Sequence, residues 1–369
     1  MRDLNYEMGG RILYCVVAIV ISRWGPKAIV SPLPTNSPLP PSILVTGYGG
    51  FLGRAICREL KKTGYRVRGL ARNNYPELEA LGVECIQASA TDLQACEAAC
   101  RGMDGVIHTA AIAGVWGPAK LYEQINVAAT DNLLSSCKKF GIRAFVYTSS
   151  PSVTFDGSAQ CNVDESVPYP TRWLCEYPRT KAIAEQHVLA DNHPTQFSTC
   201  SLRPHLIWGV GDPHLIPRVI ERCRSGRLRR VGNGRNLIDT VHVDFAAIAH
   251  RLALERMLDR DQKASGRAYF ITDGEPVECW EWISTILKSA QLKPPNKSIS
   301  FRAAYRIGGV LETIYRVLRI SSEPPMTRFV AAQLGVDHYF NITSAKERLG
   351  YVPIHNRKER IAELAGIMV

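Results

Sequence analysis

Short apolar runs alternate with segments of helical periodicity along most of this chain. The first run, 42–46, is rich in β-branched residues and ends at a glycine, as is typical of a buried parallel strand. In the next segment, apolar residues recur at Leu52, Ile56 and Leu60, which is the spacing of one helix face. Further apolar runs follow at 65–71, 105–110, 144–149 and 198–203. Parallel strands linked by helices on both faces form a doubly wound sheet, so the pattern predicts an α/β fold of the Rossmann type.

The alternation weakens after Arg203, where Pro, Gly and Arg become frequent. Substrates of such sheets bind at the carboxyl ends of the strands. We therefore expect the later residues to build a smaller cap over that edge. The predicted organisation is a dinucleotide-binding domain at 42–205 and a C-terminal substrate-binding cap over most of 206–369, with some segments returning to the Rossmann core.

Residues 1–41 differ in character from the rest of the chain. We expect a disordered leader and linker there, because residues 31–41 contain five prolines. The apolar stretch 12–22 is shorter than the ~20 residues that span a bilayer. A weak membrane anchor and a start site placed too far upstream both explain such a leader, and the sequence leaves both open.

Composition limits the class of protein. With 369 residues, 46% of them hydrophobic, the chain can bury a sizeable core as one large or two ordinary domains. Its eleven cysteines include neither a CxxC pair nor a Cys/His spacing typical of zinc. We therefore expect reduced thiols in a cytosolic protein, and no metal site.

The net charge of +11 raises the question of an anionic partner. Part of this charge lies in seven arginines between residues 218 and 235. A solvated helix face is the simplest explanation, and attraction of an anionic substrate or of acidic lipid head groups is the alternative. No aromatic-rich basic strand suited to base stacking is visible, so nucleic acid is not an expected partner.

Three glycines stand where the first strand meets the first helix: Gly47, Gly50 and Gly53. A tight turn needs one glycine, close approach of the backbone to a phosphate needs another, and helix–strand packing needs the third. The helix that begins at Phe51 and Leu52 offers unpaired N–H groups and the positive end of its dipole to an anion. A plain turn is the structural alternative, but the strand–turn–helix setting predicts that these five residues bind a dinucleotide.

The end of the second apolar run, 65–71, distinguishes the two nicotinamide dinucleotides. An acidic residue there would bind the ribose 2′-hydroxyl of NAD, whereas an arginine would bind the 2′-phosphate of NADP. No Asp or Glu follows the run, and Arg72 comes directly after it. We therefore predict NADP as the cofactor, with NAD, and an ordinary surface role for Arg72, as the alternatives.

Three side chains suggest catalysis of hydride transfer, which needs a proton donor and a second donor that polarises the carbonyl. Tyr177 and Lys181 are four residues apart and would share one helix face. A phenol with a pKa near 10 is a slow acid at neutral pH, and a nearby ammonium would stabilise its phenolate. Ser150 follows the apolar run 144–149, at the sheet edge where functional groups collect. Each signal alone is weak, since serine also serves in turns, but their order favours catalysis.

Together these motifs resemble the extended short-chain dehydrogenases/reductases, specifically the 3β-hydroxysteroid dehydrogenase-like branch. The resemblance covers the chain from about Ile43 to the C-terminus. Beyond the motifs above, it rests on the segments His108-Thr109-Ala110-Ala111, Asn126-Val127, Tyr147-Thr148-Ser149-Ser150, Leu202-Arg203-Pro204, Asn236-Leu237-Ile238-Asp239, Val241-His242-Val243-Asp244, Ala268-Tyr269-Phe270-Ile271-Thr272 and Leu349-Gly350-Tyr351-Val352-Pro353.

The resemblance implies a catalytic triad of Ser150, Tyr177 and Lys181. In this triad Tyr177 would be the acid/base, Lys181 would also hold the nicotinamide ribose, and Ser150 would orient the carbonyl. The resemblance also implies that Ala110 and Pro204 line the cofactor.

Other residues near the expected site carry weaker implications. The resemblance implies that Asn126 supports the active-site network. Family members usually carry Asp near the adenine at the position of Ser89, so the adenine contacts are expected to differ here. His205 and His214 are candidates to contact a substrate carboxylate, although histidines at a pocket are more often polar rim residues.

Two groups within this branch look most similar: sterol dehydrogenases, including those acting on sterol 4-carboxylates, and bacterial 2-alkyl-3-oxoalkanoate reductases. Both interconvert a secondary alcohol and a ketone, and segments 151–154 and 300–308 look more like the second. Since NADPH usually drives reductions, we predict a reductase of a bulky apolar β-keto acid or ketosteroid. The alternatives are a nucleotide-sugar epimerase or dehydratase, disfavoured by the missing acidic residue, and a non-catalytic dinucleotide- or RNA-binding member, disfavoured because Tyr177 and Lys181 are both present.

The segment 301–320 carries an apolar stripe with arginines among it. Such a pattern suits a membrane-surface helix or the entrance for a greasy substrate. A core-facing helix has the same periodicity and is more common. We therefore expect a cytoplasmic enzyme with a lipid-like substrate, and keep peripheral membrane contact and a homodimer as further hypotheses.

Overall fold

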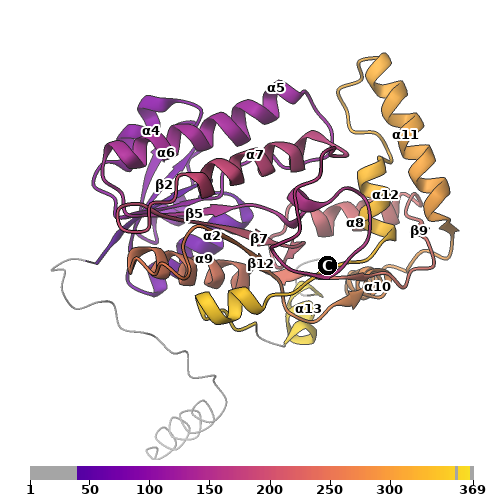
Figure 1. Cartoon of the computed structure of the whole chain (residues 1–369). Helices are drawn as coiled ribbons and strands as arrows, with labels where there is room; N and C mark the ends of the chain where they lie inside the picture. The colour runs from indigo at the N-terminus through magenta and orange to yellow at the C-terminus, as the bar shows by residue number, and fades with distance from the viewer. Residues whose placement is uncertain (1–39, 354–355, 366–369) are drawn as a thin grey trace, which may run out of the picture. The chain divides into compact units, whose positions relative to one another are not determined.

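The computed structural model describes residues 40–353 and 356–365, so the predicted leader lies outside the described residues except for Pro40 and Pro41. The core is a seven-stranded parallel sheet in the order β12-β7-β5-β4-β1-β2-β3 (Figure 1). Its strands are β1 Ser42–Thr46, β2 Arg66–Ala71, β3 Val83–Gln87, β4 Gly105–His108, β5 Ala144–Thr148, β7 Ser198–Pro204 and β12 Arg267–Ile271. The apolar runs of the sequence form the central strands, and the predicted Rossmann-type α/β fold is confirmed.

Helices cover both faces of this sheet (Figure 1). One face carries α2, Phe51–Lys62, and α9, Val243–Leu258, which pack against each other. The other carries α4 Leu93–Cys100, α6 Ala129–Lys139 and α7 Glu176–Ala190. The connecting segments include α3 Pro76–Glu79, α5 Ala119–Tyr122, the π-helical turn η1 Glu123–Ala128 and the 3₁₀ turn η2 Pro151–Thr154. The sheet therefore presents the carboxyl ends of its strands to the loops that build the site.

Close packing explains a glycine in the middle of β2. Tyr48, which follows β1, is fully buried. A Cβ at Gly69 would overlap the ring of Tyr48, and Gly69 pairs in register with Val45 of β1. The strand tolerates this glycine because the Tyr48 ring occupies the space of the missing side chain.

The second part of the chain, for which the sequence predicts the cap, folds around small sheets, with a core that includes Trp208, Trp280 and Trp282. Its strands are β8 Ile207–Trp208, β9 Arg230–Val231, β10 Leu237–Ile238, β11 Val241–His242, β13 Val277–Glu278, β14 Ser298–Ile299 and β15 His338–Phe340. Its helices are α8 Leu215–Arg224, α10 Cys279–Ser289, α11 Phe301–Val317, α12 Arg328–Gly335, the π-helical turn η3 Ala345–Leu349 and α13 Arg357–Ala365.

Each half of the sequence contributes segments to the part of the structure that the other half mainly forms. β6, Gln160–Val163, comes from the first half of the sequence, yet it pairs with β15 in the four-stranded sheet of the cap. Conversely, α9 and β12 come from the second half and complete the Rossmann core. Segments therefore cross the predicted boundary between residues 205 and 206 in both directions. The boundary itself stays a prediction.

The orientation of α11 differs from the more common arrangement that we expected. Its apolar stripe does not face a core: Val310 is 59% exposed and Val317 is 74% exposed. The inward side instead carries Ala304, Gly308 and Glu312. Within the residues that the structure describes, no helix combines the length and apolar character needed to cross a bilayer.

Candidate active site

The glycine-rich turn between β1 and α2 leaves a bare helix N-terminus beside an open space. Gly47 has a φ of +65°, and a Cβ there would come within 2.9 Å of the Ala110 backbone. A Cβ at Gly53 would overlap the carbonyl oxygen of Gly47. Gly50 occupies the N-cap of α2 and provides no side-chain hydrogen bond. The first N–H groups of α2 and its positive dipole end can therefore receive a phosphate.

One cavity of about 520 Å³ extends from this turn across the carboxyl edge of the sheet. The structure brings all the residues predicted for catalysis or cofactor binding to its lining: Gly47, Gly50, Phe51, Leu52, Gly53, Arg72, Ala110, Ser150, Tyr177, Lys181 and Pro204. These residues come from α2, α7 and β7 and from the loops after β1, β2, β4 and β5, which the parallel sheet aligns at a single edge.

Lys181 is held firmly on the inner face of α7. Its side chain is almost completely buried, and its Nζ donates a hydrogen bond of 2.6 Å to the carbonyl oxygen of Thr148. The same Nζ lies 4.0 Å from the centroid of the Tyr147 ring. Burial lowers the pKa of Lys181 to about 7, and the carboxylate of Glu185 opposes this shift. The amine can therefore gain or lose a proton near neutral pH.

Tyr177 and Ser150 meet at the cavity wall. Burial raises the pKa of the Tyr177 phenol above its usual value, and a hydrogen bond with the Ser150 side chain opposes this effect. We expected Lys181 to lower the phenol pKa, but in the structure desolvation is the larger influence, and the Lys181 amine is directed at Thr148. A phenol that stays protonated at neutral pH is suited to donate its proton.

Ser150 has two roles at once. Its hydroxyl caps η2 by accepting hydrogen bonds from the backbone N–H of Ser152 at 3.2 Å and from the Ser152 hydroxyl at 2.9 Å. This is the turn chemistry that serines commonly perform. The capping bonds fix the hydroxyl where it also reaches Tyr177, so the turn positions the side chain for the cavity.

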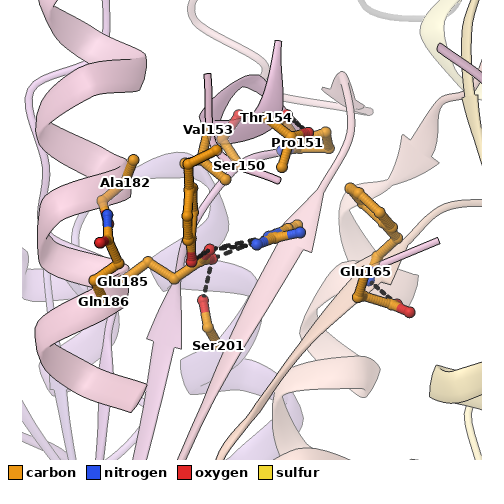
Figure 2. Close-up of polar contacts among 12 residues, drawn as sticks. Ser150, Pro151, Val153, Thr154, Glu165, Ala182, Glu185, Gln186 and Ser201 are labelled. Atoms are coloured by element: carbon orange, nitrogen blue, oxygen red, sulfur yellow. Dashed lines mark hydrogen bonds and ion pairs between the residues drawn. The ribbon is translucent and has the colours of Figure 1, made fainter. Parts of the chain in front are cut away.

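A buried acid on α7, the helix that carries Tyr177 and Lys181, was not predicted. Glu185, one helical turn after Lys181, is fully buried and forms an ion pair with Arg203 of β7. Its carboxylate also accepts hydrogen bonds from Ser201 at 2.7 Å and from Tyr169 at 2.8 Å. Figure 2 shows Glu185 reaching from α7 toward Ser201 on the neighbouring strand. The sequence carried a signal, because an acid four residues after Lys181 and a basic residue in an apolar strand both require a partner.

Asn126 lies behind the cavity, in the π-helical turn η1. Its Oδ1 accepts from the backbone N–H of Ile112 at 2.9 Å, and its Nδ2 donates to the Thr180 hydroxyl at 3.0 Å. It thereby ties the loop after β4 to the helix that carries Tyr177. π-Helical turns of this kind are frequent at functional sites.

The far end of the cavity is lined by Arg72, Asn73 and Tyr75, of which we predicted only Arg72 from the sequence. Arg72 is exposed, and no ion pair involves its guanidinium in the part of the chain that the structure describes. Ser89 also lines the cavity, and its hydroxyl forms a hydrogen bond of 2.8 Å with the hydroxyl of Thr91.

The two candidate histidines lie in different surroundings. His214 is exposed and belongs to the cavity lining. His205 is buried and its Nε2 lies 2.7 Å from Nδ1 of His338, outside that lining. Since burial lowers the pKa of both paired histidines, His205 is a neutral structural group.

A parallel Rossmann sheet, a glycine-rich phosphate turn and a serine–tyrosine–lysine set in one cavity define the extended short-chain dehydrogenases/reductases. The model of the 3-beta hydroxysteroid dehydrogenase/isomerase family matches residues 44–302, and the chain belongs to this family.

The chain is also similar to individual proteins of known activity or structure. The chain is 45% identical over 325 residues to the 2-alkyl-3-oxoalkanoate reductase of Stenotrophomonas maltophilia (strain K279a), covering 87% of this chain and 98% of that protein. It is 32% identical over 335 residues to the 3 beta-hydroxysteroid dehydrogenase/Delta 5-->4-isomerase of Mycobacterium tuberculosis (strain CDC 1551 / Oshkosh), covering 87% and 88%. The crystal structure of gox2253 matches with a TM-score of 0.71 at 26% identity, covering 88% of this chain and 97% of that one. The chain is thus an oxidoreductase of the 3β-hydroxysteroid dehydrogenase and 2-alkyl-3-oxoalkanoate reductase type.

Proposed function

We propose that this protein is an NADPH-dependent reductase that converts the ketone of a 2-alkyl-3-oxoalkanoate, or of a similarly bulky β-keto acid, to a secondary alcohol. The observation that carries the proposal is the single cavity that joins the glycine turn to Ser150, Tyr177 and Lys181. The similarity to 2-alkyl-3-oxoalkanoate reductase over nearly the full length of that relative supports the substrate class.

The lining of the cavity suits a dinucleotide at one end. The spaces beside Gly47 and Gly53 have no room for a side chain, and the N-terminus of α2 offers backbone donors to a pyrophosphate. Arg72 would pair with a ribose 2′-phosphate, which is the basis for proposing NADPH over NADH. When bound, the cofactor supplies the hydride that the carbonyl carbon receives.

The protein's own side chains handle the oxygen of the substrate. Ser150 donates a hydrogen bond to the ketone oxygen and Tyr177 donates its phenolic proton as negative charge develops there. One hydride and one proton together convert the ketone to the alcohol. The Tyr177 phenolate then recovers a proton from water, while Lys181 would hold the nicotinamide ribose.

The test measures nicotinamide absorbance with NADPH and with NADH. The substrates are a 2-alkyl-3-oxo acid, a 3-ketosteroid and a UDP-sugar. The stable 2-alkyl-3-hydroxy acid with NADP provides the reverse reaction, which avoids spontaneous loss of CO₂ from the β-keto acid. We expect NADPH-dependent turnover of the oxo acid, and its loss in Tyr177→Phe. Conversion of the UDP-sugar without consumption of added cofactor would overturn the proposal in favour of an epimerase.

A further inference from the structure

A second cavity, of about 590 Å³, lies between the loop after β4, the start of α7 and the end of α11. Its size is within the range of pockets that bind small molecules. Its lining includes the apolar or aromatic side chains of Val115, Trp116, Tyr122, Leu174, Tyr315 and Ile320. None of these side chains lines the catalytic cavity, so the second cavity, which we call the Trp116 pocket, is a separate space.

Three segments of the chain form the border between the two spaces. Each segment contributes one residue to the catalytic cavity and another, two or three positions away, to the Trp116 pocket. The pairs, with the residue of the catalytic cavity first, are Ala113 and Val115, Ile125 and Tyr122, and Tyr177 and Cys175. The Trp116 pocket therefore begins directly beside the side chain that donates the proton in the proposed reaction.

Hydrogen bonds hold this border in place. The hydroxyl of the buried Tyr122 lies 3.1 Å from the carbonyl oxygen of Gly114 and 3.2 Å from that of Trp116. The indole Nε1 of Trp116 donates to the carbonyl oxygen of Ile320 at 3.2 Å. The Trp116 ring also meets the ring of Tyr315 edge-on, with centroids 6.1 Å apart. These contacts tie the loop after β4 to the end of α11, so the pocket is formed before any ligand binds.

The charged groups of the lining do not prevent an apolar ligand from binding. Its two acids, Glu176 and Glu312, each form an ion pair of 2.7 Å with an arginine. Burial raises the pKa of the Cys175 thiol to about 12, so this group is neutral. Arg316 is exposed, and its guanidinium carbon lies 5.7 Å from the centroid of the Trp116 ring. An apolar chain can therefore fill the pocket without leaving a buried charge unpaired.

The proposed substrate needs such a space. The lining of the catalytic cavity extends from the glycine turn to Tyr177 and Lys181, and a bound dinucleotide would lie along this length. A 2-alkyl-3-oxo acid carries one hydrocarbon chain on C2 and a second chain beyond the ketone carbon C3. With the cofactor in place, these chains require apolar space beyond it, next to Tyr177.

We propose that the Trp116 pocket binds one hydrocarbon chain of the substrate while the ketone lies at Tyr177. This inference rests on the proposed function, because the position of the reacting ketone defines where each chain begins. A chain long enough to pass the border contacts Trp116 and Leu174, and its binding strengthens with the apolar area that it buries. The pocket thereby makes long-chain substrates better than short ones.

The experiment measures kcat/KM of the full chain with NADP and 2-alkyl-3-hydroxy acids, each kept below the concentration at which it forms micelles. One series of acids lengthens the chain on C2, and the other lengthens the chain beyond C3. In one series, kcat/KM should rise by up to about fourfold for each methylene that enters the pocket. The rise should end once the pocket is filled, and the other series should respond less.

Two variants of α5 distinguish the pocket from its surroundings. Ala119 belongs to the lining, so Ala119→Trp places an indole in the space of the chain. It should lower the ratio of kcat/KM for a long acid to that for a short acid by about tenfold or more, the effect of losing roughly two buried methylenes. Leu121 is 39% exposed and lies outside the lining, so Leu121→Trp should keep the wild-type ratio.

A third variant enlarges the pocket instead of filling it. Leu174→Ala removes part of the apolar lining, so kcat/KM should continue to rise at chain lengths where the wild type has levelled off. A loss of folded protein would lower kcat/KM for all acids alike and would not produce this shift.

The results distinguish this inference from the proposed function. If the acids are turned over but kcat/KM does not depend on chain length, the Trp116 pocket does not bind the chain and the proposed function stands. The same conclusion follows if Ala119→Trp and Leu121→Trp change the ratio equally. If no acid of either series is turned over, the proposed function is wrong and this inference fails with it.

Discussion

Replacing Glu185 with Gln removes one charge from a buried ion pair between α7, the helix that carries Tyr177 and Lys181, and strand β7. The Glu185 side chain is 0% exposed and that of its partner Arg203 is 3% exposed. Arg203, Ser201 and Tyr169 all donate hydrogen bonds to the carboxylate. A glutamine of the same size keeps one acceptor oxygen but turns an NH₂ toward these donors. Arg203 would then be a buried charge without a counter-ion.

The magnitude follows from that geometry. Removing one partner of a buried pair costs about 3–5 kcal/mol, whereas removing one partner of an exposed pair costs about 0–1 kcal/mol. The chain offers a more exposed comparison in Glu97, which is itself 25% exposed and forms a 2.6 Å ion pair with Lys139, which is 56% exposed. We therefore expect Glu185→Gln to lower the free energy of unfolding by about 3–5 kcal/mol and Glu97→Gln by less than about 1 kcal/mol.

Urea unfolding, followed by tryptophan fluorescence, measures both variants. The double variant Glu185→Gln/Arg203→Met should recover much of the loss, because it leaves no unpaired charge. The pH profile of kcat supplies a second readout. Glu185 raises the pKa of Lys181, so Glu185→Gln should lower that pKa further and reduce the rate at neutral pH. If Glu185→Gln costs no more stability than Glu97→Gln, the assignment of this pair as the electrostatic support of α7 is wrong.

Four further predictions concern the cavity. Tyr177→Phe should abolish turnover while NADPH binding, measured by fluorescence titration, stays nearly intact; loss of both would contradict its role as proton donor. Arg72→Ala should weaken NADPH by about tenfold or more and NADH little, and equal losses in the two titrations would refute the choice of NADPH. Gly53→Ala should weaken both dinucleotides and lower the melting temperature, because its Cβ would overlap the Gly47 carbonyl oxygen; unchanged melting would contradict this packing. Burial lowers the pKa of Lys181 from 10.5 to about 7, so between these pH values the unfolded chain binds more protons and the contribution of this group to stability rises with pH. Lys181→Met should remove that rise when urea unfolding is compared at pH ~7 and ~9, and an identical pH dependence in both proteins would refute the pKa assignment.

Local sequence patterns were sufficient to predict the strand, turn and helix that form the phosphate end of the site. The apolar run that forms β1, the glycines that follow it and the periodic residues of α2 each report a conformation that neighbouring residues impose. Because parallel strands end at one edge, the order of these segments also placed Ser150 and Tyr177 beside the same cavity.

Side-chain electrostatics could not be read from spacing. The four-residue spacing of Tyr177 and Lys181 indicates a shared helix face, but the pKa of each depends on burial, and that of Tyr177 also on Ser150 from the turn after β5. The ion pair between Glu185 and Arg203 joins positions 18 residues apart on a helix and a strand. Only their packing reveals that each supplies the counter-charge of the other.

Local sequence was enough to assign residues to a strand, a turn or a helix face, because backbone conformation depends mostly on near neighbours. The tertiary structure decided which way each face points and what lies against it. Helix α11 illustrates the difference: its periodicity suited a core helix, but Gly308 against Thr327 and Glu312 against Arg328 hold the apolar stripe toward solvent. Contacts between distant segments fix such orientations, and no local pattern contains them.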